Sequence, residues 1–280
     1  MYYEPPIAFQ IGPVAVRWYG IIITAGFIAG IFIAQRSCKY YRWSPDDLID
    51  FALLLIPCAI IGARLYYVVT SWSEFAGHPL NIFKTWTGGL AVYGGIIGGV
   101  IAAFFYCRVR KKSLLELMDI GMPSIALGQA IGRWGNFVNQ EAFGPVVSNP
   151  NLQWFPYSVF IEADQQYHMA TFFYESLWCL LLFIFLMAMR RKFRHRGDAA
   201  LSYLMLYGLE RAFVEGFRTD SLYVGSFRIS QLLSILLVVG VAAFFLVRWL
   251  RERGAPVHIT NRAHPDYIWP DETSLAPQDA

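Results

Sequence analysis

The stretch GRWGNFVNQEAFG, from Gly132 to Gly144, gathers the side chains best suited to chemistry. Arg133 brings a guanidinium fork with five N–H donors, and two asparagines and a glutamate follow it closely. Burial of such groups at the end of an apolar segment costs free energy unless they are paired or hydrated. Because guanidinium forks suit carboxylate and phosphate groups best, the stretch predicts a site for an anion.

A simpler interpretation is that Arg133 only reaches outward to lipid headgroups, as arginines at the ends of membrane spans do. That interpretation leaves the accompanying Asn136, Asn139 and Glu141 unexplained. The glycines interspersed among these residues also allow another backbone or a ligand to approach closely.

A second set of polar side chains lies in YGLERAFVEGFR, 207–218, within another apolar segment. At about 100° per residue, Tyr207, Arg211, Glu215 and Arg218 share one face of a helix. Arg211 and Glu215 stand four residues apart, so the two charges can neutralise each other. Two arginines against one glutamate still leave a positive charge, which again favours an anionic ligand.

A third candidate is the glycine-rich block GGLAVYGGIIGG, 88–99. Its glycines make overlapping small-xxx-small faces, a pattern typical of close helix packing. Tyr93 sits at one end of this helix and is the block's polar side chain.

The elements that position these residues are predicted to be membrane helices. Of the 280 residues, 56% are hydrophobic and only 15% are charged, whereas soluble domains carry about a quarter charged residues. Long apolar stretches approach the roughly 20 residues that a bilayer span needs. The four cysteines lack C-x-x-C spacing and are interpreted as small buried hydrophobic residues: Cys38, Cys58, Cys107 and Cys179.

We expect an all-α polytopic membrane protein with about seven transmembrane helices. The candidate segments are 18–35, 48–70, 90–107, 114–135, 171–189, 199–217 and 230–249. Basic clusters follow only the odd-numbered segments: RSCKYYR, RVRKK, RRKFRHR and RWLRER. Because basic loops stay in the cytoplasm, this alternation places the N-terminus outside and the C-terminus in the cytoplasm.

The sequence predicts one transmembrane catalytic domain, 1–253, followed by a polar cytoplasmic tail, 254–280. The N-terminus lacks the features of a cleaved signal peptide, so the first apolar segment is expected to be a retained span. The loop at about 136–170 is expected on the outer face. The polar positions of the first half have no counterparts in the second, which argues mildly against an inverted-repeat transporter.

These residues resemble one known family. GRWGNFVNQEAFG is similar to the signature of the prolipoprotein diacylglyceryl transferases, the bacterial enzymes that attach the first lipid to lipoprotein precursors. The resemblance runs from about residue 12 to 250, and further blocks match in the same order: RWYG (17–20), GARLYYV (62–68), GGLAVYGG (88–95), TFFYES (171–176), YGLERAFVEGFR (207–218) and QLLS (231–234).

The resemblance implies transfer of the diacylglyceryl group from phosphatidylglycerol to the thiol of the lipobox cysteine in a prolipoprotein signal peptide. The products are a thioether and glycerol phosphate, and no metal or soluble cofactor takes part. The implied location is the bacterial cytoplasmic (inner) membrane, multi-pass, with the active site toward the outer face. Membrane lipids and signal peptides are the expected partners, and nucleic acid is not.

By the same resemblance, Arg133 and Arg211 bind the phosphate and stabilise the leaving group, and Glu141 and Tyr93 join them as catalytic residues. Preorganised guanidinium groups in a dry site stabilise developing phosphate charge well. The other implied residues hold the arginines, shape the loop or line the cavity: Asn136, Asn139, Gly144, Tyr19, Tyr207, Glu215 and Arg218.

The proton acceptor for the attacking thiol stays open. Many family members carry His at the position of Tyr93, and a phenol with a pKa near 10 is a poor base. Many also carry His-Pro where this chain has Met169 and Ala170, so the neighbouring His168 is a second candidate. Alternatively, Tyr93 only donates a hydrogen bond, or the two arginines lower the pKa of the thiol.

Two other classes of function compete with the transferase. A lipid transporter or scramblase for anionic lipids also needs arginines at headgroup depth, but it moves lipid without covalent change. An intramembrane protease needs a Ser/His pair or two aspartates within the membrane, and the sequence offers no convincing pair at matching depth.

Overall fold

The computed structural model describes residues 6–12, 14–41, 43–85, 88–217, 223–224 and 227–253, and these are mostly helical. They fall into two compact units. The first draws on residues 6–34 and 118–253, and the second is formed by residues 35–117. Arg218 and the tail 254–280, both named in the sequence-based predictions, lie outside the described residues.

The long helices agree with the segments expected from hydropathy, with ends that differ by a few residues. They are α1 (Trp18–Ser37), α2 (Pro45–Thr70), α4 (Val92–Val109), α5 (Leu114–Asn139), α6 (Thr171–Met189), α7 (Asp198–Val214) and α8 (Ile229–Glu252). Among the described residues, all of these except α7 are long and apolar enough to cross a membrane, which makes six candidate spans. Helix α7 has 17 residues, somewhat fewer than the roughly 20 of a typical span.

Short elements connect and cap the helices. In the first unit these are the antiparallel hairpins β1 (Ile7–Ile11) with β2 (Val14–Arg17), β3 (Ser158–Ile161) with β4 (Gln166–Met169), and β5 (Tyr223–Val224) with β6 (Phe227–Arg228), and the 3-10 turns η4 (Pro150–Leu152) and η5 (Glu215–Phe217). In the second unit they are η1 (Cys38–Tyr40), α3 (Trp72–Phe75) and η2 (Pro79–Phe83).

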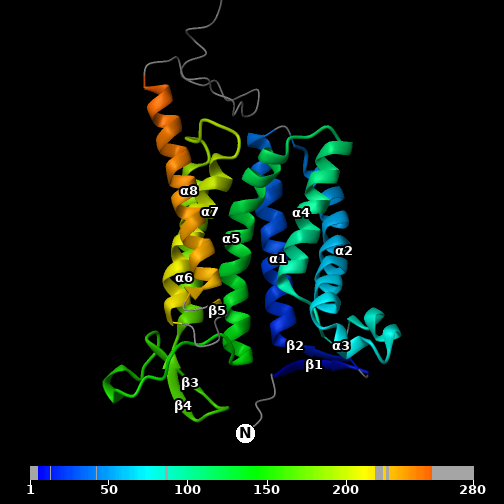
Figure 1. Ribbon diagram of the computed structural model, residues 1–280, viewed down its shortest axis with the longest axis vertical. Coiled ribbons are helices and arrows are strands. Elements are labelled where there is room, and N and C mark those ends of the chain that lie inside the picture. Colours follow the sequence, from blue (N-terminus) through cyan, green and yellow to red (C-terminus); the bar gives the residue numbers. More distant parts are fainter. Residues whose placement is uncertain are drawn as a thin grey trace, which may run out of the picture. The chain divides into compact units, whose positions relative to one another are not determined.

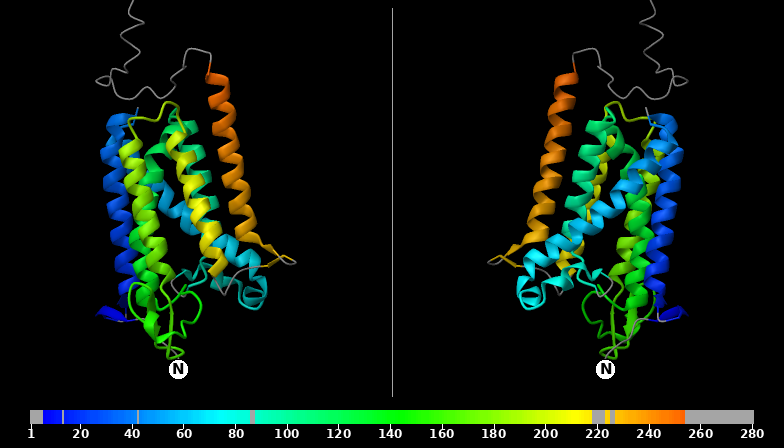
Figure 2. Two further views of the ribbon diagram at one scale, coloured as in Figure 1. Left: turned by 90° about the vertical axis from the view of Figure 1, so that its left-hand side faces the viewer. Right: turned by 90° about the vertical axis from the view of Figure 1, so that its right-hand side faces the viewer.

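Within the first unit, α1 packs closely on α5 because glycines remove the side chains between them. A Cβ added to Gly26 would lie 3.3 Å from the carbonyl oxygen of Gly128, and one added to Gly30 would lie 3.3 Å from that of Ser124. The β3–β4 hairpin lies at the same end of this unit as the C-terminal end of α5 (Figures 1 and 2). The sequence's strongest polar motif is therefore held at that end.

Helices α6, α7 and α8 pack against one another, with α7 running along both of its neighbours (Figure 1). A buried core between α6 and α7 includes Ala126 of α5 and is completed by Leu182, Leu186, Phe193, Ala199 and Tyr203. At the far end from the hairpin, buried Asp119 of α5 accepts the N–H groups of Gly197 at 2.7 Å and Ala200 at 3.0 Å. This carboxylate satisfies donors that the first turn of α7 leaves without partners inside the helix.

The second unit is built on the contact between α2 and α4. A Cβ added to Gly62, Gly94 or Gly98 would overlap the backbone of the facing helix. The small-residue faces predicted from the sequence therefore serve helix packing, as expected. The four cysteines are all free, and three of them are buried, which agrees with their interpretation as small hydrophobic residues.

Candidate active site

A buried ion pair joins the signature motif to α6. Arg133, near the C-terminal end of α5, pairs through Nη2 with Oε2 of Glu175, in the second turn of α6. The Glu175 side chain is only 1% exposed, so its charge depends on this cation. The Arg133 side chain is 19% exposed. This geometry argues against the simpler interpretation, in which Arg133 only reaches out to lipid headgroups.

The same carboxylate also meets the second arginine. Nη1 of Arg211, on α7, lies 3.6 Å from Oε2 of Glu175, while its Nη2 lies 3.1 Å from Oε2 of Glu215. The pair of Arg211 and Glu215 expected from their spacing is therefore formed. The sequence-based balance of two arginines against one glutamate omitted Glu175, which comes from another helix. Glu175 thereby brings the two predicted phosphate-binding arginines together.

A chain of side-chain hydrogen bonds holds the turn after Arg133. Its Nη1 lies 3.4 Å from Oδ1 of Asn136, and Nδ2 of Asn136 donates to Oε1 of Glu141 at 2.9 Å. Asn139 donates to the same Glu141 oxygen at 3.4 Å. The backbone turns here through Gln140, at φ 51°. The motif's two amides and carboxylate thus fix the turn and connect it to the arginine.

Two tyrosines of the predicted site lie beside the arginines. The ring of Tyr19 packs on Gly135, where an added Cβ would lie 2.8 Å from a ring carbon. Its hydroxyl interacts electrostatically with Glu141 and Arg133. Tyr207 of α7 interacts electrostatically with both Arg133 and Arg211. The structure therefore brings both tyrosines to the arginine pair.

Gly144, which the resemblance implies as a residue that shapes the loop, packs closely against the residues that precede and begin α6. A Cβ at this position would lie 2.9 Å from side-chain atoms of Met169 and Thr171. Its N–H donates to the carbonyl oxygen of Met169 at 2.9 Å. The glycine thus lets the loop after α5 lie directly on the end of β4.

His168 holds the same loop in place through contacts of both ring nitrogens. Its Nδ1 lies 2.8 Å from the carbonyl oxygen of Gly144, and its Nε2 lies 2.7 Å from Oδ2 of Asp164. The ring also packs on Phe143 at 4.4 Å between centroids and is 6% exposed. Because both ring nitrogens already have partners, this histidine is poorly placed to accept a proton from a substrate.

Tyr93 belongs to the second unit. It lies in the first turn of α4, is 58% exposed, and has its ring 6.3 Å from that of Tyr66. Its side chain is therefore accessible. A role for its hydroxyl remains a prediction.

Sequence reasoning missed two buried carboxylates, Glu175 and Glu210. Both are single acidic residues in otherwise apolar helical faces, and that is the signal that could have found them, because charged groups are rare and expensive inside spans. Glu210 of α7 is 5% exposed, and in the described part of the chain neither of its oxygens has a hydrogen-bond partner. Its charge interacts with those of Glu175, Arg133 and Arg211.

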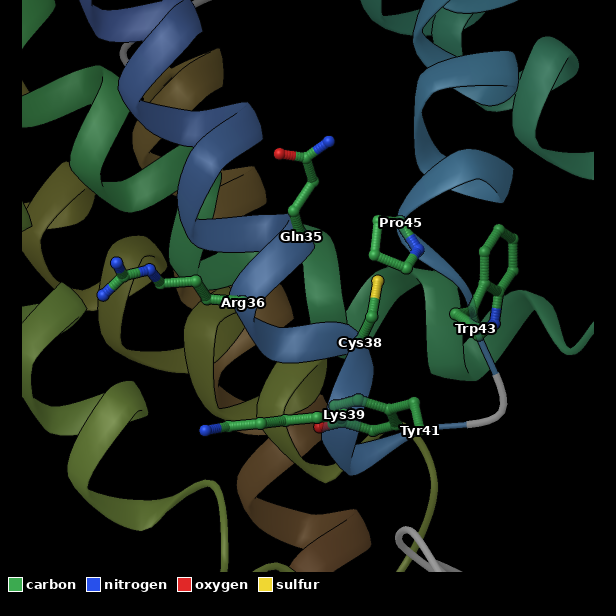
Figure 3. A pocket seen from close by; sticks show the side chains of 7 residues that line it. All are labelled: Gln35, Arg36, Cys38, Lys39, Tyr41, Trp43 and Pro45. Atoms are coloured by element: carbon green, nitrogen blue, oxygen red, sulfur yellow. The ribbon is translucent and has the colours of Figure 1, made fainter.

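A cavity of about 450 Å³ lies elsewhere, in the second unit (Figure 3). It is lined by Gln35, Arg36, Cys38, Lys39, Tyr41, Trp43 and Pro45, none of which belongs to the predicted site. The side chains of Arg36 and Lys39 extend away from the Cys38 thiol, which points toward Pro45 (Figure 3). The cavity therefore gathers no convergent charges, and the arginine cluster is the better candidate site.

The arginine cluster can bind an anion and stabilise negative charge as it develops. Each guanidinium has five donors, and the acidic partners described above engage only some of them. Among the described residues, no group of three or more His, Cys, Asp or Glu side chains is arranged to hold a metal ion. The chemistry that this geometry supports best is binding and activation of a phosphate group.

Comparison with known proteins points to one family. The family model for prolipoprotein diacylglyceryl transferase matches residues 6–247. A Clostridium botulinum protein (strain Hall), named phosphatidylglycerol–prolipoprotein diacylglyceryl transferase, is 45% identical over 251 residues, which cover 88% of this chain and 98% of the relative. A protein of the same name from Streptococcus equi subsp. zooepidemicus is 43% identical over 253 residues, covering 89% of this chain and 96% of the relative.

Proposed function

This chain belongs to the prolipoprotein diacylglyceryl transferase family, and from that premise we propose that it transfers the diacylglyceryl group of phosphatidylglycerol to a prolipoprotein. The acceptor is the thiol of the lipobox cysteine. The observation that carries the proposal within the molecule is the joining of Arg133 and Arg211 through buried Glu175. That arrangement gives two preorganised cationic forks for one phosphate group.

In the reaction, the thiol sulfur attacks the glycerol carbon that bears the phosphate. A sulfur–carbon bond forms, the carbon–oxygen bond breaks, and its electron pair leaves with glycerol phosphate. The free donors of Arg133 and Arg211 stabilise the charge that gathers on the departing phosphate. Glu175 and Glu215 hold the two guanidinium groups in place, so little reorganisation is needed at the moment of reaction.

The remaining predicted residues act around this pair. Asn136, Asn139 and Glu141 hold the turn that aims Arg133, through the hydrogen bonds described above. The lipid site is lined or shaped by Tyr19, Gly144 and Tyr207. Tyr93 stays a predicted catalytic residue, and Arg218 stays a predicted substrate-binding residue. For Tyr93, unchanged rates in Tyr93→Phe would remove its hydroxyl from the mechanism.

The proposal includes a membrane topology of seven spans, with α7 as the sixth in order. The basic clusters after alternate spans support an outer N-terminus and a cytoplasmic C-terminus. The motif end of α5 would then face outward, in the bacterial cytoplasmic membrane. Residues 1–253 would form the catalytic domain, with 254–280 as a cytoplasmic tail. Two variants test this topology, each with a single cysteine that replaces either exposed Glu162 or Lys111. Only the cysteine at position 162 should react with an impermeant maleimide in intact cells.

The competing function, anionic-lipid transport, is not favoured by the family membership. The two are separated in vesicles of phosphatidylglycerol that contain the purified protein and a lipobox peptide. A transferase releases glycerol phosphate in proportion to peptide, whereas a transporter redistributes lipid and releases none. Lipid redistribution without glycerol phosphate would reject the proposed function.

A further inference from the structure

The proposed transfer needs a group that accepts the proton of the acceptor thiol. A thiol with a pKa near 8.5 is mostly protonated at neutral pH, and the thiolate is the nucleophile. The inference below rests on the proposed function, because it identifies this acceptor.

Among the described residues around the arginines, most candidate bases are already engaged. His168 has partners on both ring nitrogens. Glu141 accepts from two amides. Glu175 and Glu215 are paired with the arginines that hold the phosphate. Protonation of Glu141, Glu175 or Glu215 would weaken the contacts that hold the turn and the two arginines, because a neutral carboxyl group accepts hydrogen bonds and pairs with cations less strongly than a carboxylate does.

Glu210 differs from them because its carboxylate takes no part in the ion pairs that hold Glu175 and Glu215. It immediately precedes Arg211 on α7, and its side chain is buried, yet in the described chain neither of its carboxyl oxygens receives a hydrogen bond. The charged groups that interact with it electrostatically are Arg133 from α5, Glu175 from α6 and Arg211 from its own helix. The Cys179 thiol of α6 and the phenols of Tyr203 and Tyr207 also lie within electrostatic range.

A buried carboxylate without donors is expensive to keep charged, and unpaired buried groups of this kind in native proteins call for an explanation. Structural stability does not provide one, because an apolar residue would fill the same space at lower cost. A carboxylate that lacks a donor beside a phosphate site is, however, well prepared to receive a proton during the reaction.

We propose that Glu210 is a catalytic residue that accepts the proton of the lipobox thiol. As sulfur attacks the glycerol carbon, the S–H proton passes to a Glu210 oxygen, and the carbon–oxygen electron pair passes to the phosphate held by Arg133 and Arg211. The protonated Glu210 then returns its proton to the departing glycerol phosphate. Atoms and charge balance without any further reactant.

The test compares wild type, Glu210→Gln and the exposed control Glu162→Gln in phosphatidylglycerol vesicles with a lipobox peptide. At pH 7, Glu210→Gln should lower kcat about 100-fold, in the range that a lost general base produces. Its rate should then rise about tenfold per pH unit toward the thiol pKa near 8.5, because the thiol ionises without help. Over the same range, the rates of wild type and Glu162→Gln should rise less steeply than that of Glu210→Gln.

A selenocysteine peptide provides the second measurement, because a selenol is already ionised at neutral pH and needs no base. The ratio of the selenocysteine rate to the cysteine rate should be much larger in Glu210→Gln than in wild type. If Glu210→Gln fails to insert, the same ratio in Glu210→Asp should also exceed that of wild type. A kcat that is unchanged, or lowered equally at every pH and for both acceptors, would overturn the inference. Inactive wild type would instead reject the proposed function.

Discussion

Arg133 on α5 and Arg211 on α7 both contact a single atom, Oε2 of buried Glu175 on α6. Three helices that are separated in the sequence thereby meet at one carboxylate. The contact sets the spacing of two guanidinium forks before any lipid arrives. Preorganisation of this kind is what makes charge stabilisation effective in a dry site.

Replacing Glu175 with Gln should therefore damage both stability and function. Removing one member of a buried ion pair leaves uncompensated charge, which destabilises proteins by about 3–5 kcal/mol. We expect a clearly lower midpoint of thermal unfolding and a loss of transfer of about 100-fold or more. Tryptophan fluorescence during heating and the peptide assay measure the two effects. Glu162→Gln, at an exposed position, serves as the matched control and should behave as wild type.

At position 211, we expect transfer activity to depend on the shape of the guanidinium group as well as on its charge. Lysine retains the charge but cannot contact Glu175 and Glu215 through two separate nitrogens of one fork, as Arg211 does. We expect Arg211→Lys to remain inserted in the membrane and to retain only a small fraction of transfer. Arg133→Ala and Arg211→Ala should abolish it. Full activity in Arg211→Lys would mean that a point charge is sufficient.

His168 should contribute to stability and leave the chemistry of proton transfer untouched. His168→Gln loses at least one of the contacts to Gly144 and Asp164, so the loop between α5 and α6 should be cleaved faster by protease. The pH dependence of kcat should keep the shape seen in wild type. Asp164→Asn is the partner variant and should share this behaviour. A pH profile that changes shape in His168→Gln would restore the histidine as a candidate base.

Arg64 is predicted to organise the loop that leads into α4. Its guanidinium donates to five backbone carbonyl groups, those of Asn81, Ile82, Lys84, Gly88 and Gly89. Arg64→Met would leave several of these acceptors without donors, each worth about 1–3 kcal/mol when buried. Faster hydrogen exchange in residues 81–89 is the expected result. Glu162→Gln, at an exposed position outside this loop, provides the control and should leave exchange in residues 81–89 nearly unchanged.

Much of the fold follows from the sequence because apolar length and helical periodicity are local properties. The ends of α6 were predicted to the residue, and the shared face of Tyr207, Arg211 and Glu215 follows from 100° per residue. The glycine face of α4 was likewise evident from its spacing.

The contacts between elements were harder to predict, because periodicity says which side chains share a face and leaves open which face they meet. Glu175 lies in an apolar helix, and its role as a partner of two arginines becomes evident only when α5 and α7 place an arginine on either side of it. The sequence left His168 as a second candidate base, and only the folded loop shows that both of its ring nitrogens have hydrogen-bond partners. Glu210, next to Arg211, was overlooked for the same reason, because periodicity does not show which residues of other helices it meets.

The most direct test of the account uses purified protein, phosphatidylglycerol and a synthetic lipobox peptide that carries either Cys or Ser at the acceptor position. Mass spectrometry then measures the diacylglyceryl adduct on each peptide. We predict an adduct on the Cys peptide alone, with one glycerol phosphate released per adduct. No adduct on either peptide from folded protein would contradict the account, as would equal modification of the Ser peptide.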